Sequence, residues 1–242
     1  MKKVAVVILN WNGRKLLEEF LPSVVNFTNT EIADIIIADN NSTDDSLEFL
    51  SSYYPTLEVI ALPQNYGYAD GYNKTLKLLN HEYYVLLNSD VEVTANWLDP
   101  LYQYIEQHTD VAAIQPKVLA QRNKSCFEYA GAAGGFIDKL GYPFCRGRIF
   151  NQVEKDTDQY NTPLEIFWAT GAYSSGHRIT GMPEDWMLHF LHIWKRSIFA
   201  GGSMPEDENW YVCRNQQYIM LEVLHYRKKV QEKHSSISEI IY

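Results

Sequence analysis

The sequence predicts an α/β fold with a mostly parallel central sheet covered by helices on both faces. Three apolar runs, at residues 4–9, 32–38 and 83–87, predict strands, and the first two are rich in β-branched residues. Between them lie segments whose apolar residues have helical spacing, such as residues 14–25. Strands that are apolar along their whole length and alternate with helices are typical of a parallel sheet buried on both faces.

The predicted elements follow one another regularly along the first half of the chain. The predicted strands are residues 4–9, 32–38, 57–62, 83–87 and 111–114, and the predicted helices are residues 14–25, 44–52, 69–79 and 97–107. Ser42 or Thr43 is expected to cap the second helix, and Pro63 closes the third strand. A length of 242 residues suits one large domain or a domain with an appendage.

The composition indicates which kinds of partner are disfavoured and in which cellular compartment we expect the protein. The formal net charge of -9 argues against a nucleic acid or an anionic membrane as the main partner. No apolar run is long enough to span a bilayer. The run at residues 4–9 is short, β-branched and without a cleavage site, so we expect a buried strand rather than a signal peptide. The three cysteines lack metal-ligand spacing, which fits a reducing cytoplasm.

Polar residues interrupt the apolar pattern mainly in four loops that follow predicted strands, at residues 10–13, 39–42, 63–68 and 88–92. Ligands of open parallel sheets bind at such carboxyl ends, so we expect the functional site there. The first loop lacks the G-x-G-x-x-G pattern, which disfavours a nicotinamide-type fold. The second loop places a carboxylate where a nucleobase or ribose can donate to it. The fourth offers oxygen ligands, which suit Mg²⁺ or Mn²⁺ beside a diphosphate.

Four segments at consecutive strand ends resemble the family 2 glycosyltransferases, which have the GT-A fold. The segments are VAVVILNWNG, IIIADNNSTDDS, NYGYADGYN and YYVLLNSDVEV, in that order and at family-like intervals. The resemblance covers residues 4–172 and is closest to the rhamnosyltransferase-like branch, in which the metal motif often is N-x-D rather than D-x-D. One such segment is weak evidence, whereas four in order are highly specific.

The resemblance implies a nucleotide-sugar donor and a divalent metal, Mg²⁺ or Mn²⁺. It implies that Asp90 binds the metal that bridges the diphosphate and that Asp39 faces the base. Asn88 stands where D-x-D has its first aspartate, which leaves metal binding through that position open. The expected substrate-binding residues are Asn10, Asn12, Asp39, Asn41, Asn65, Asp70 and Asn88.

The chemistry that the resemblance implies is an inverting transfer of a hexosyl or deoxyhexosyl group from a UDP- or dTDP-sugar to a glycan or lipid-linked acceptor. A divalent cation stabilises the charge on the leaving diphosphate, and a general base on the opposite face of the sugar accepts the acceptor's proton. The family supplies that base as an aspartate of a Glu-Asp-type pair late in the chain. The expected setting is bacterial surface-polysaccharide assembly in the cytoplasm, with peripheral contact to the inner face of the membrane.

The chain from residue 173 onward does not continue this pattern, and the family's Glu-Asp segment is missing where it is expected. Possible codons for residues 190–202 and the adjoining bases, read one base out of frame, can encode FFAHMEEIDLCWRL, the expected acceptor-side segment with its base. Residues 213–225 and 228 onward also become family-like in that frame. We therefore predict an insertion or deletion near residue 172, with a GT-A domain at 1–172 and an out-of-frame tail at 173–242.

Two consequences follow for the tail. An out-of-frame segment is not selected to fold, so we expect it to be irregular or helical, with helical fragments such as residues 186–195 or 222–233. If the frame is correct, Asp185 of the Glu184-Asp185 pair is the candidate base.

Several alternatives stay open at this point. A binding-only protein would keep the nucleotide-sugar pocket but lack a carboxylate on the acceptor side. An unrelated doubly wound domain, such as a dehydrogenase or nucleotidyltransferase, is disfavoured by the missing glycine-rich loop. Asn10 and Asn12 can be turn residues, and Asp39 and Asp90 can be helix caps. Trp11 is expected to pack against the protein rather than to stack on a substrate.

Overall fold

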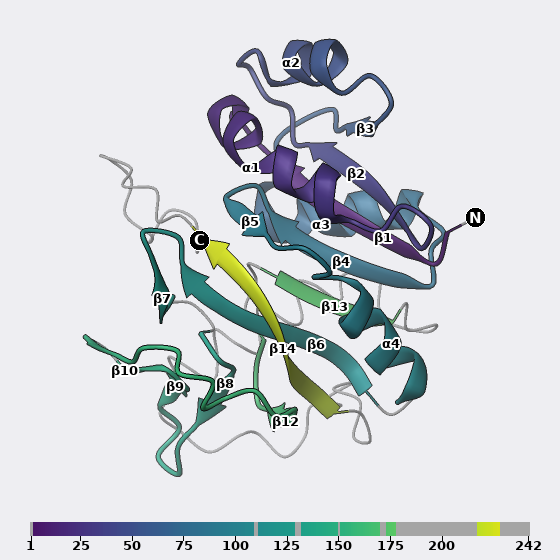
Figure 1. Cartoon of the computed structure of the whole chain (residues 1–242). Helices are drawn as coiled ribbons and strands as arrows, with labels where there is room; N and C mark the ends of the chain where they lie inside the picture. Colours follow the sequence, from purple (N-terminus) through teal and green to yellow (C-terminus); the bar gives the residue numbers. More distant parts are fainter. Residues whose placement is uncertain are drawn as a thin grey trace.

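The computed structural model describes residues 2–108, 111–128, 132–149, 151–169, 173–177 and 217–227 (Figure 1). Its helices are α1 (Arg14–Phe27), α2 (Ser46–Tyr53), α3 (Gly67–Leu78) and α4 (Asp99–Gln107). Its strands are β1 (Val4–Asn10), β2 (Ala33–Asp39), β3 (Glu58–Ala61), β4 (Tyr83–Asn88), β5 (Val91–Val93), β6 (Val111–Ala120), β7 (Asn123–Phe127), β8 (Gly135–Ile137), β9 (Pro143–Cys145), β10 (Arg148–Ile149), β11 (Gln152–Val153), β12 (Leu164–Ile166), β13 (Tyr173–His177) and β14 (Gln217–Arg227). In this part of the chain no helix is long and apolar enough to cross a membrane.

One side of the large sheet is a parallel block in which β3, β2, β1 and β4 lie in that spatial order. Asn10, the last residue of β1, pairs with Asp39, the last residue of β2. On the other side of β1, Leu9 pairs with Asn88, the last residue of β4. The register therefore brings three polar strand ends to one edge of the sheet, and the predicted parallel sheet is confirmed.

Helices cover both faces of this parallel block (Figure 1). In β1, Val6 and Ile8 belong to a core cluster that includes residues of α1, α2 and α4. Ala5 and Val7 belong to a second cluster, which includes residues of α3. Because successive side chains of a strand point to opposite faces, one apolar run contributes to both layers. The expectation of helices on both faces is confirmed.

Beyond β4 the sheet is mixed. β13 lies antiparallel between β4 and β6, and β14 runs parallel to β6 and antiparallel to β5 and β12. The strands β8 to β11 form a separate antiparallel sheet beside this half of the molecule.

The two described parts of the tail are strands and not the irregular or helical structure that we expected, while residues 186–195 lie outside the described residues. Residues 222–227, within the segment expected to be helical, belong to the strand β14, and residues 173–177 form β13. Ile219, Val223 and Tyr226 are residue types that favour extended chain. Pairing with β6 satisfies the backbone of β14, and that partner cannot be recognised from local spacing.

Two helix starts also differ from the prediction. Asp45, not Ser42 or Thr43, precedes α2, and it makes no side-chain cap hydrogen bond. The hydroxyl of Ser42 instead donates to Asp39. α3 begins two residues earlier than predicted, at Gly67, whose φ of 74° lies in the left-handed region that favours glycine.

Ion pairs hold the amino-terminal edge of the sheet, opposite the polar strand ends. Asp34 lies 2.8 Å from Lys2 Nζ and 3.0 Å from His81 Nε2. Glu106 of α4 lies 3.0 Å from Lys3 Nζ and also accepts a hydrogen bond from the Tyr83 hydroxyl. Burial of Asp34 opposes its ionisation, but the hydrogen bonds from Lys2 and His81 outweigh burial and lower its pKa.

Replacing Asp34 by asparagine is expected to lower the free energy of unfolding at pH 7 by roughly 1 kcal/mol or less, because solvent screens this partly exposed pair. A carboxyl whose pKa is lowered on folding stabilises the protein above its unfolded-state pKa of about 3.9 and loses this effect as pH falls through the folded-state value. Urea unfolding of wild type and Asp34→Asn at pH 7 and pH 3 measures the difference. An undiminished difference at pH 3 would contradict the expectation, and Glu58→Gln on β3 serves as the control.

Candidate functional site

The candidate site lies where β1 and β4 end. Residues after β1 lead through α1 to β2 on one side of β1, whereas β4 lies on its other side. The strand order therefore reverses at β1, and open parallel sheets bind ligands at such a reversal. Three of the four predicted loops start at these neighbouring strand ends, and the fourth leads from β3 into α3.

The first two loops are joined by a buried cluster of Asn10, Asp39 and Ser42. Asp39 Oδ1 accepts from Asn10 Nδ2 at 2.9 Å and from Ser42 Oγ at 2.6 Å, and Asp39 Oδ2 accepts from Ser42 N at 2.9 Å. Ser42 Oγ in turn accepts from Asn10 Nδ2 at 3.1 Å. Asp39 is only 1% exposed, so its carboxylate organises the loops. Its contact with a base stays a prediction.

Asn12 also connects the first two loops. Its Oδ1 accepts from Thr43 N at 2.7 Å and from Asp44 N at 3.3 Å, and its backbone N–H donates to Ser42 Oγ at 2.9 Å. Its φ is 50°, a left-handed conformation that asparagine tolerates better than most residues. The structure thus shows a loop-forming role for Asn12, while its contact with a nucleotide stays a prediction.

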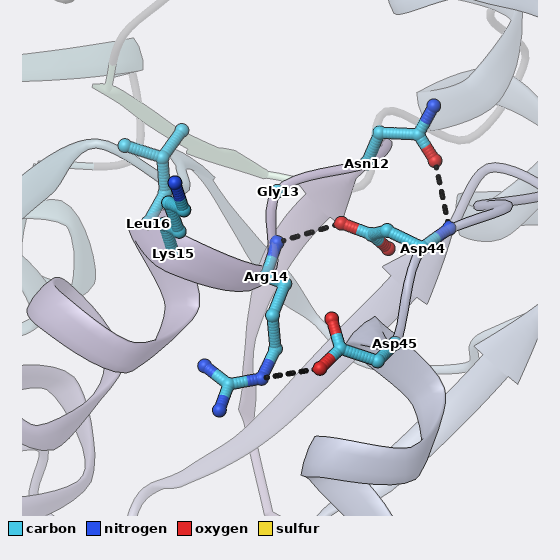
Figure 2. Close-up of a pocket in the computed structure, with 7 residues that line it drawn as sticks. All are labelled: Asn12, Gly13, Arg14, Lys15, Leu16, Asp44 and Asp45. Carbon is cyan, nitrogen blue, oxygen red and sulfur yellow. Dashed lines mark hydrogen bonds and ion pairs between the residues drawn. The ribbon is translucent and has the colours of Figure 1, made fainter.

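A cavity of about 250 Å³ lies beside the first loop (Figure 2). Arg14 N donates to Asp44 Oδ2 at 3.1 Å, and Arg14 Nε lies 3.6 Å from Asp45 Oδ2. The cavity is lined by Asn12, Gly13, Arg14, Lys15, Leu16, Asp44 and Asp45. Neither Asp39 nor Asp90 is among these residues, so the cavity adjoins the predicted donor site and does not contain it.

The third loop brings Asn65 and Asp70 to the same edge. Asn65 Oδ1 accepts from Asn40 Nδ2 and from Gly67 N, both at 2.8 Å. Asp70 lies in the first turn of α3, and its half-buried carboxylate makes no hydrogen bond or ion pair with the residues that the structure describes. A carboxylate at a helix start is favoured by the helix dipole, and this one remains available to a ligand.

The fourth loop carries Asn88 and Asp90, both half-buried. Asn88 Oδ1 accepts from the Tyr68 hydroxyl at 3.2 Å, and the Tyr72 hydroxyl donates to the carbonyl of Leu87 at 3.1 Å. Burial, the neighbouring Tyr68 and the charge of Asp90 together raise the pKa of Tyr72 well above its ordinary value. α3 is therefore packed against the predicted metal loop.

The oxygen ligands of this loop fit a metal that arrives with a diphosphate. Among the described residues no group of three or more acidic, histidine or cysteine side chains could hold an ion by itself. The carboxylate of Glu92 is bound by Lys124, whose Nζ lies 2.8 Å from Oε2. Asp90 and Asn88 are the other oxygen-bearing side chains predicted for this site, and Mg²⁺ is commonly held by one or two protein oxygens together with phosphate oxygens.

The expectation that Trp11 packs against the protein is wrong, because Trp11 is 57% exposed. It directly follows the fully buried Asn10. Trp11 lies beyond the last residue of β1, in the loop where the chain leaves the sheet, so strand alternation does not apply to it. Asn41, next to the buried Asn40, is likewise exposed and has a φ of 63°.

Asp185, the candidate base, lies outside the described residues, as do Glu184 and the pair at 206–207.

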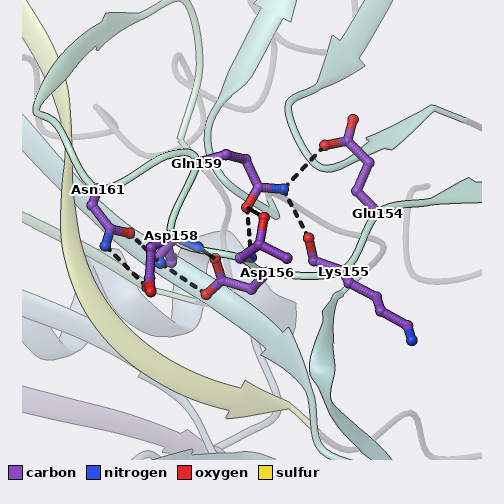
Figure 3. A network of polar contacts seen from close by, with 8 residues as sticks. Glu154, Lys155, Asp156, Asp158, Gln159 and Asn161 are labelled. Atoms are coloured by element: carbon purple, nitrogen blue, oxygen red, sulfur yellow. Dashed lines mark hydrogen bonds and ion pairs between the residues drawn. The ribbon is translucent and has the colours of Figure 1, made fainter.

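Lys117 of β6 is fully buried, and its Nζ donates to Asp156 Oδ2 at 2.8 Å and to Asn161 Oδ1 at 2.7 Å. Figure 3 shows the surrounding network, in which residues 154–161 bond largely to one another. Lys117 therefore anchors this segment to the sheet.

Comparisons with solved structures show the fold. GalNAc-T7 with UDP, GalNAc and Mn²⁺ has a TM-score of 0.62 at 16% identity, with 98% of this chain and 46% of that chain covered. The mannosyltransferase PcManGT from Pyrobaculum calidifontis, in complex with GDP-Man and Mn²⁺, has a TM-score of 0.56 at 14% identity, with 98% and 59% covered. Both are GT-A glycosyltransferases, and the predicted GT-A fold is confirmed.

Comparisons of sequence identify the family. A poly(ribitol-phosphate) beta-glucosyltransferase of Bacillus spizizenii is 32% identical over 173 residues, which are 68% of this chain and 27% of that protein. The chain spans at most 39% of the length of the curated relatives it matches. The family model for glycosyl transferase family 2 matches residues 5–171, which is more than half of the sequence and contains every described residue of the predicted site. The chain therefore belongs to glycosyl transferase family 2.

Proposed function

We propose that this chain is an inverting glycosyltransferase that moves a hexosyl or deoxyhexosyl group from a UDP- or dTDP-sugar to a polysaccharide or glycolipid acceptor. The observation that carries the proposal is the convergence of Asn10, Asp39 and Asn88 at adjacent strand ends, with Asp90 two residues beyond Asn88. In a family 2 chain this edge offers base-side and diphosphate-side groups to one ligand. The Bacillus relative, named for glucosyl transfer to a poly(ribitol-phosphate), supports a polymeric acceptor.

Each residue of the donor side has a distinct proposed task. Asp90, with the amide oxygen of Asn88, would hold Mg²⁺ or Mn²⁺, which when bound neutralises the charge that develops on the leaving diphosphate. Asp39 would accept a hydrogen bond from the base through the remaining capacity of Oδ2. Trp11 would stack on the base. Asn12, Asn41, Asn65 and Asp70 would border the ribose and the sugar.

Transfer needs one further group on the acceptor side. The acceptor oxygen attacks the anomeric carbon as the bond from that carbon to the diphosphate oxygen breaks, and the acceptor's proton passes to a carboxylate. A single in-line displacement inverts the anomeric centre. In the chain as given, Asp185 is the proposed carboxylate. We place this chemistry in bacterial surface-polysaccharide and cell-wall assembly, in the cytoplasm at the inner face of the membrane.

A second candidate function is a nucleotide-sugar-binding remnant without turnover. It is favoured by the shifted-frame match, in which the family's base segment replaces residues 190–202. Under this proposal residues 1–172 form the binding domain and residues 173–242 are an out-of-frame tail. Every residue proposed for the donor side lies before residue 91, so all of them belong to the proposed binding domain.

Calorimetric titration with UDP and dTDP, with and without Mn²⁺, tests the donor site. Wild type is expected to bind one of them with Mn²⁺-dependent affinity, and Asp90→Ala is expected to weaken the Mn²⁺-dependent binding by about tenfold or more because a ligand of the bridging ion is lost. Asp34→Asn, which changes a carboxylate at the opposite edge, is the control. Binding that ignores Mn²⁺, or that survives Asp90→Ala unchanged, would contradict the proposed metal site.

Replacing Trp11 by alanine tests stacking on the base. Stacking on an aromatic side chain contributes roughly 1–3 kcal/mol per base, so UDP affinity is expected to fall by about tenfold or more. The melting temperature should barely change, because Trp11 is 57% exposed. Trp11→Phe keeps an aromatic face and should retain most of the affinity. Equal affinities of wild type and Trp11→Ala would remove Trp11 from the site.

Resequencing the source gene across codon 172 and assaying both frames separates the two candidate functions. If the tail is out of frame, the chain as given should bind UDP but should not transfer sugar from a UDP-sugar, so no UDP is released. A chain with the restored frame should release UDP from the UDP-sugar. If the frame is intact and the given chain turns over, the remnant proposal fails, and Asp185→Asn should then lower turnover by about a hundredfold or more without changing UDP affinity.

A further inference from the structure

Asn40 is a buried residue that ties the end of β2 to the third loop. Its side chain is 2% exposed. Its Nδ2 donates to Asn65 Oδ1 at 2.8 Å and to the carbonyl of Gly67 at 3.0 Å, and its Oδ1 accepts from Tyr66 N at 3.0 Å. Its backbone N–H donates to the carbonyl of Asn10 at 2.7 Å. One residue thus contacts the ends of two strands and the start of α3.

The contacts of Asn40 require an amide at this position. Both hydrogens of Nδ2 point at oxygen acceptors, while Oδ1 faces a backbone donor, and only an amide combines two donors and an acceptor in this shape. Gly67 is held with a φ of 74°, so the turn that Asn40 bonds has a backbone conformation that few other residues adopt. A Cβ added to Gly71, the fifth residue of α3, would lie 3.2 Å from Nδ2, which shows how closely the start of this helix approaches the amide.

The same turn of α3 reaches the metal loop. Tyr68, the residue after Gly67, donates its hydroxyl proton to Asn88 Oδ1 at 3.2 Å. Its ring meets that of Tyr72 edge to face with centroids 5.1 Å apart, and the Tyr72 hydroxyl bonds the carbonyl of Leu87. A continuous set of contacts therefore runs from Asn40 through α3 to the residues that precede Asp90.

We propose that Asn40 is a positioning residue that couples the two sides of the donor site through the first turn of α3. The nucleotide side is Asn10, Asp39 and Ser42, and the metal side is Asn88 and Asp90. Asn40 fixes the first turn of α3 by hydrogen bonds from the nucleotide side. Tyr68 lies in that turn, and its hydrogen bond to Asn88 makes the position of Asn88 depend on the position of the turn. The effect of this coupling on donor binding rests on the proposed function, whereas the coupling of the loops can be measured without a ligand.

Hydrogen exchange of the ligand-free protein tests the coupling directly. Asn40→Ala and Asn40→Asp are each expected to speed amide exchange in residues 64–70, and in residues 88–92, by about tenfold, because buried hydrogen bonds are lost. Asn40→Asp keeps the shape of the side chain but replaces the donor Nδ2 by an acceptor oxygen that faces Asn65 Oδ1 and the carbonyl oxygen of Gly67. It should therefore be at least as disruptive as alanine. If Asn40 only filled space, Asn40→Asp would leave amide exchange unchanged.

The matched control is Asn29→Ala. Asn29 links the amino-terminal edge to α4 through similar bonds, with Nδ2 2.7 Å from Asp99 Oδ1 and Oδ1 accepting from Glu31 N at 3.0 Å. Asn29→Ala should lower the melting temperature by about as much as Asn40→Ala does, roughly a few degrees. It should not speed amide exchange at residues 64–70 or 88–92. Unchanged exchange in Asn40→Asp, or equal acceleration in Asn29→Ala, would overturn the proposal.

Tyr68→Phe covers the case in which an Asn40 variant does not fold. It removes one hydroxyl, so it should speed exchange at residues 88–92 and leave residues 64–66 protected. In calorimetry it should reduce the gain in UDP affinity that Mn²⁺ brings, by about tenfold, and leave metal-free affinity unchanged. Wild type that binds neither UDP nor dTDP would refute the proposed function, while the exchange data would still decide the positioning role. Unaltered exchange at residues 88–92 in Tyr68→Phe would refute the coupling.

Discussion

The in-register parallel pairing of β1 with β2 and β4 is the constraint on which the proposed donor side of this protein depends. It makes Asn10 and Asp39 direct neighbours and sets Asn88 beside Leu9. β1 packs on α1, α2 and α4 with one face and on α3 with the other. A slip of one residue would exchange these two sets of side chains, so the apolar core holds the register and with it the polar edge.

At that edge the polar side chains bond mainly to one another. Asp39 and Asn40 are almost fully buried, and each forms several hydrogen bonds that join neighbouring loops. Buried polar groups must find such partners, and a loop system that satisfies them internally is held in place before any ligand binds. The groups that remain for a ligand are more exposed, such as the indole of Trp11 and the carboxylate of Asp70.

The residues proposed for donor binding and the residue proposed as base lie in different parts of the sequence. Four loops between residues 10 and 92 carry the residues proposed for the donor side, and the parallel block supports these loops. Acceptor chemistry needs a carboxylate on the other face of the sugar, and its candidate, Asp185, lies outside the described residues. The mixed half of the sheet, in which β14 lies between β12 and β6, borders the parallel block at β13.

The sequence by itself determined the parallel block, because unbroken β-branched runs and helical spacing are local patterns that survive into the fold, and it identified the strand-end loops from where those patterns stop. Only the tertiary structure decided that residues 217–227 are a strand, since their partner β6 is distant in sequence. It alone showed that Asp39 and Asn12 bond to neighbouring loops, that Trp11 is exposed and that Asn40 is central. The direction of a loop side chain depends on donors and acceptors that folding brings from other segments, and no local pattern encodes them.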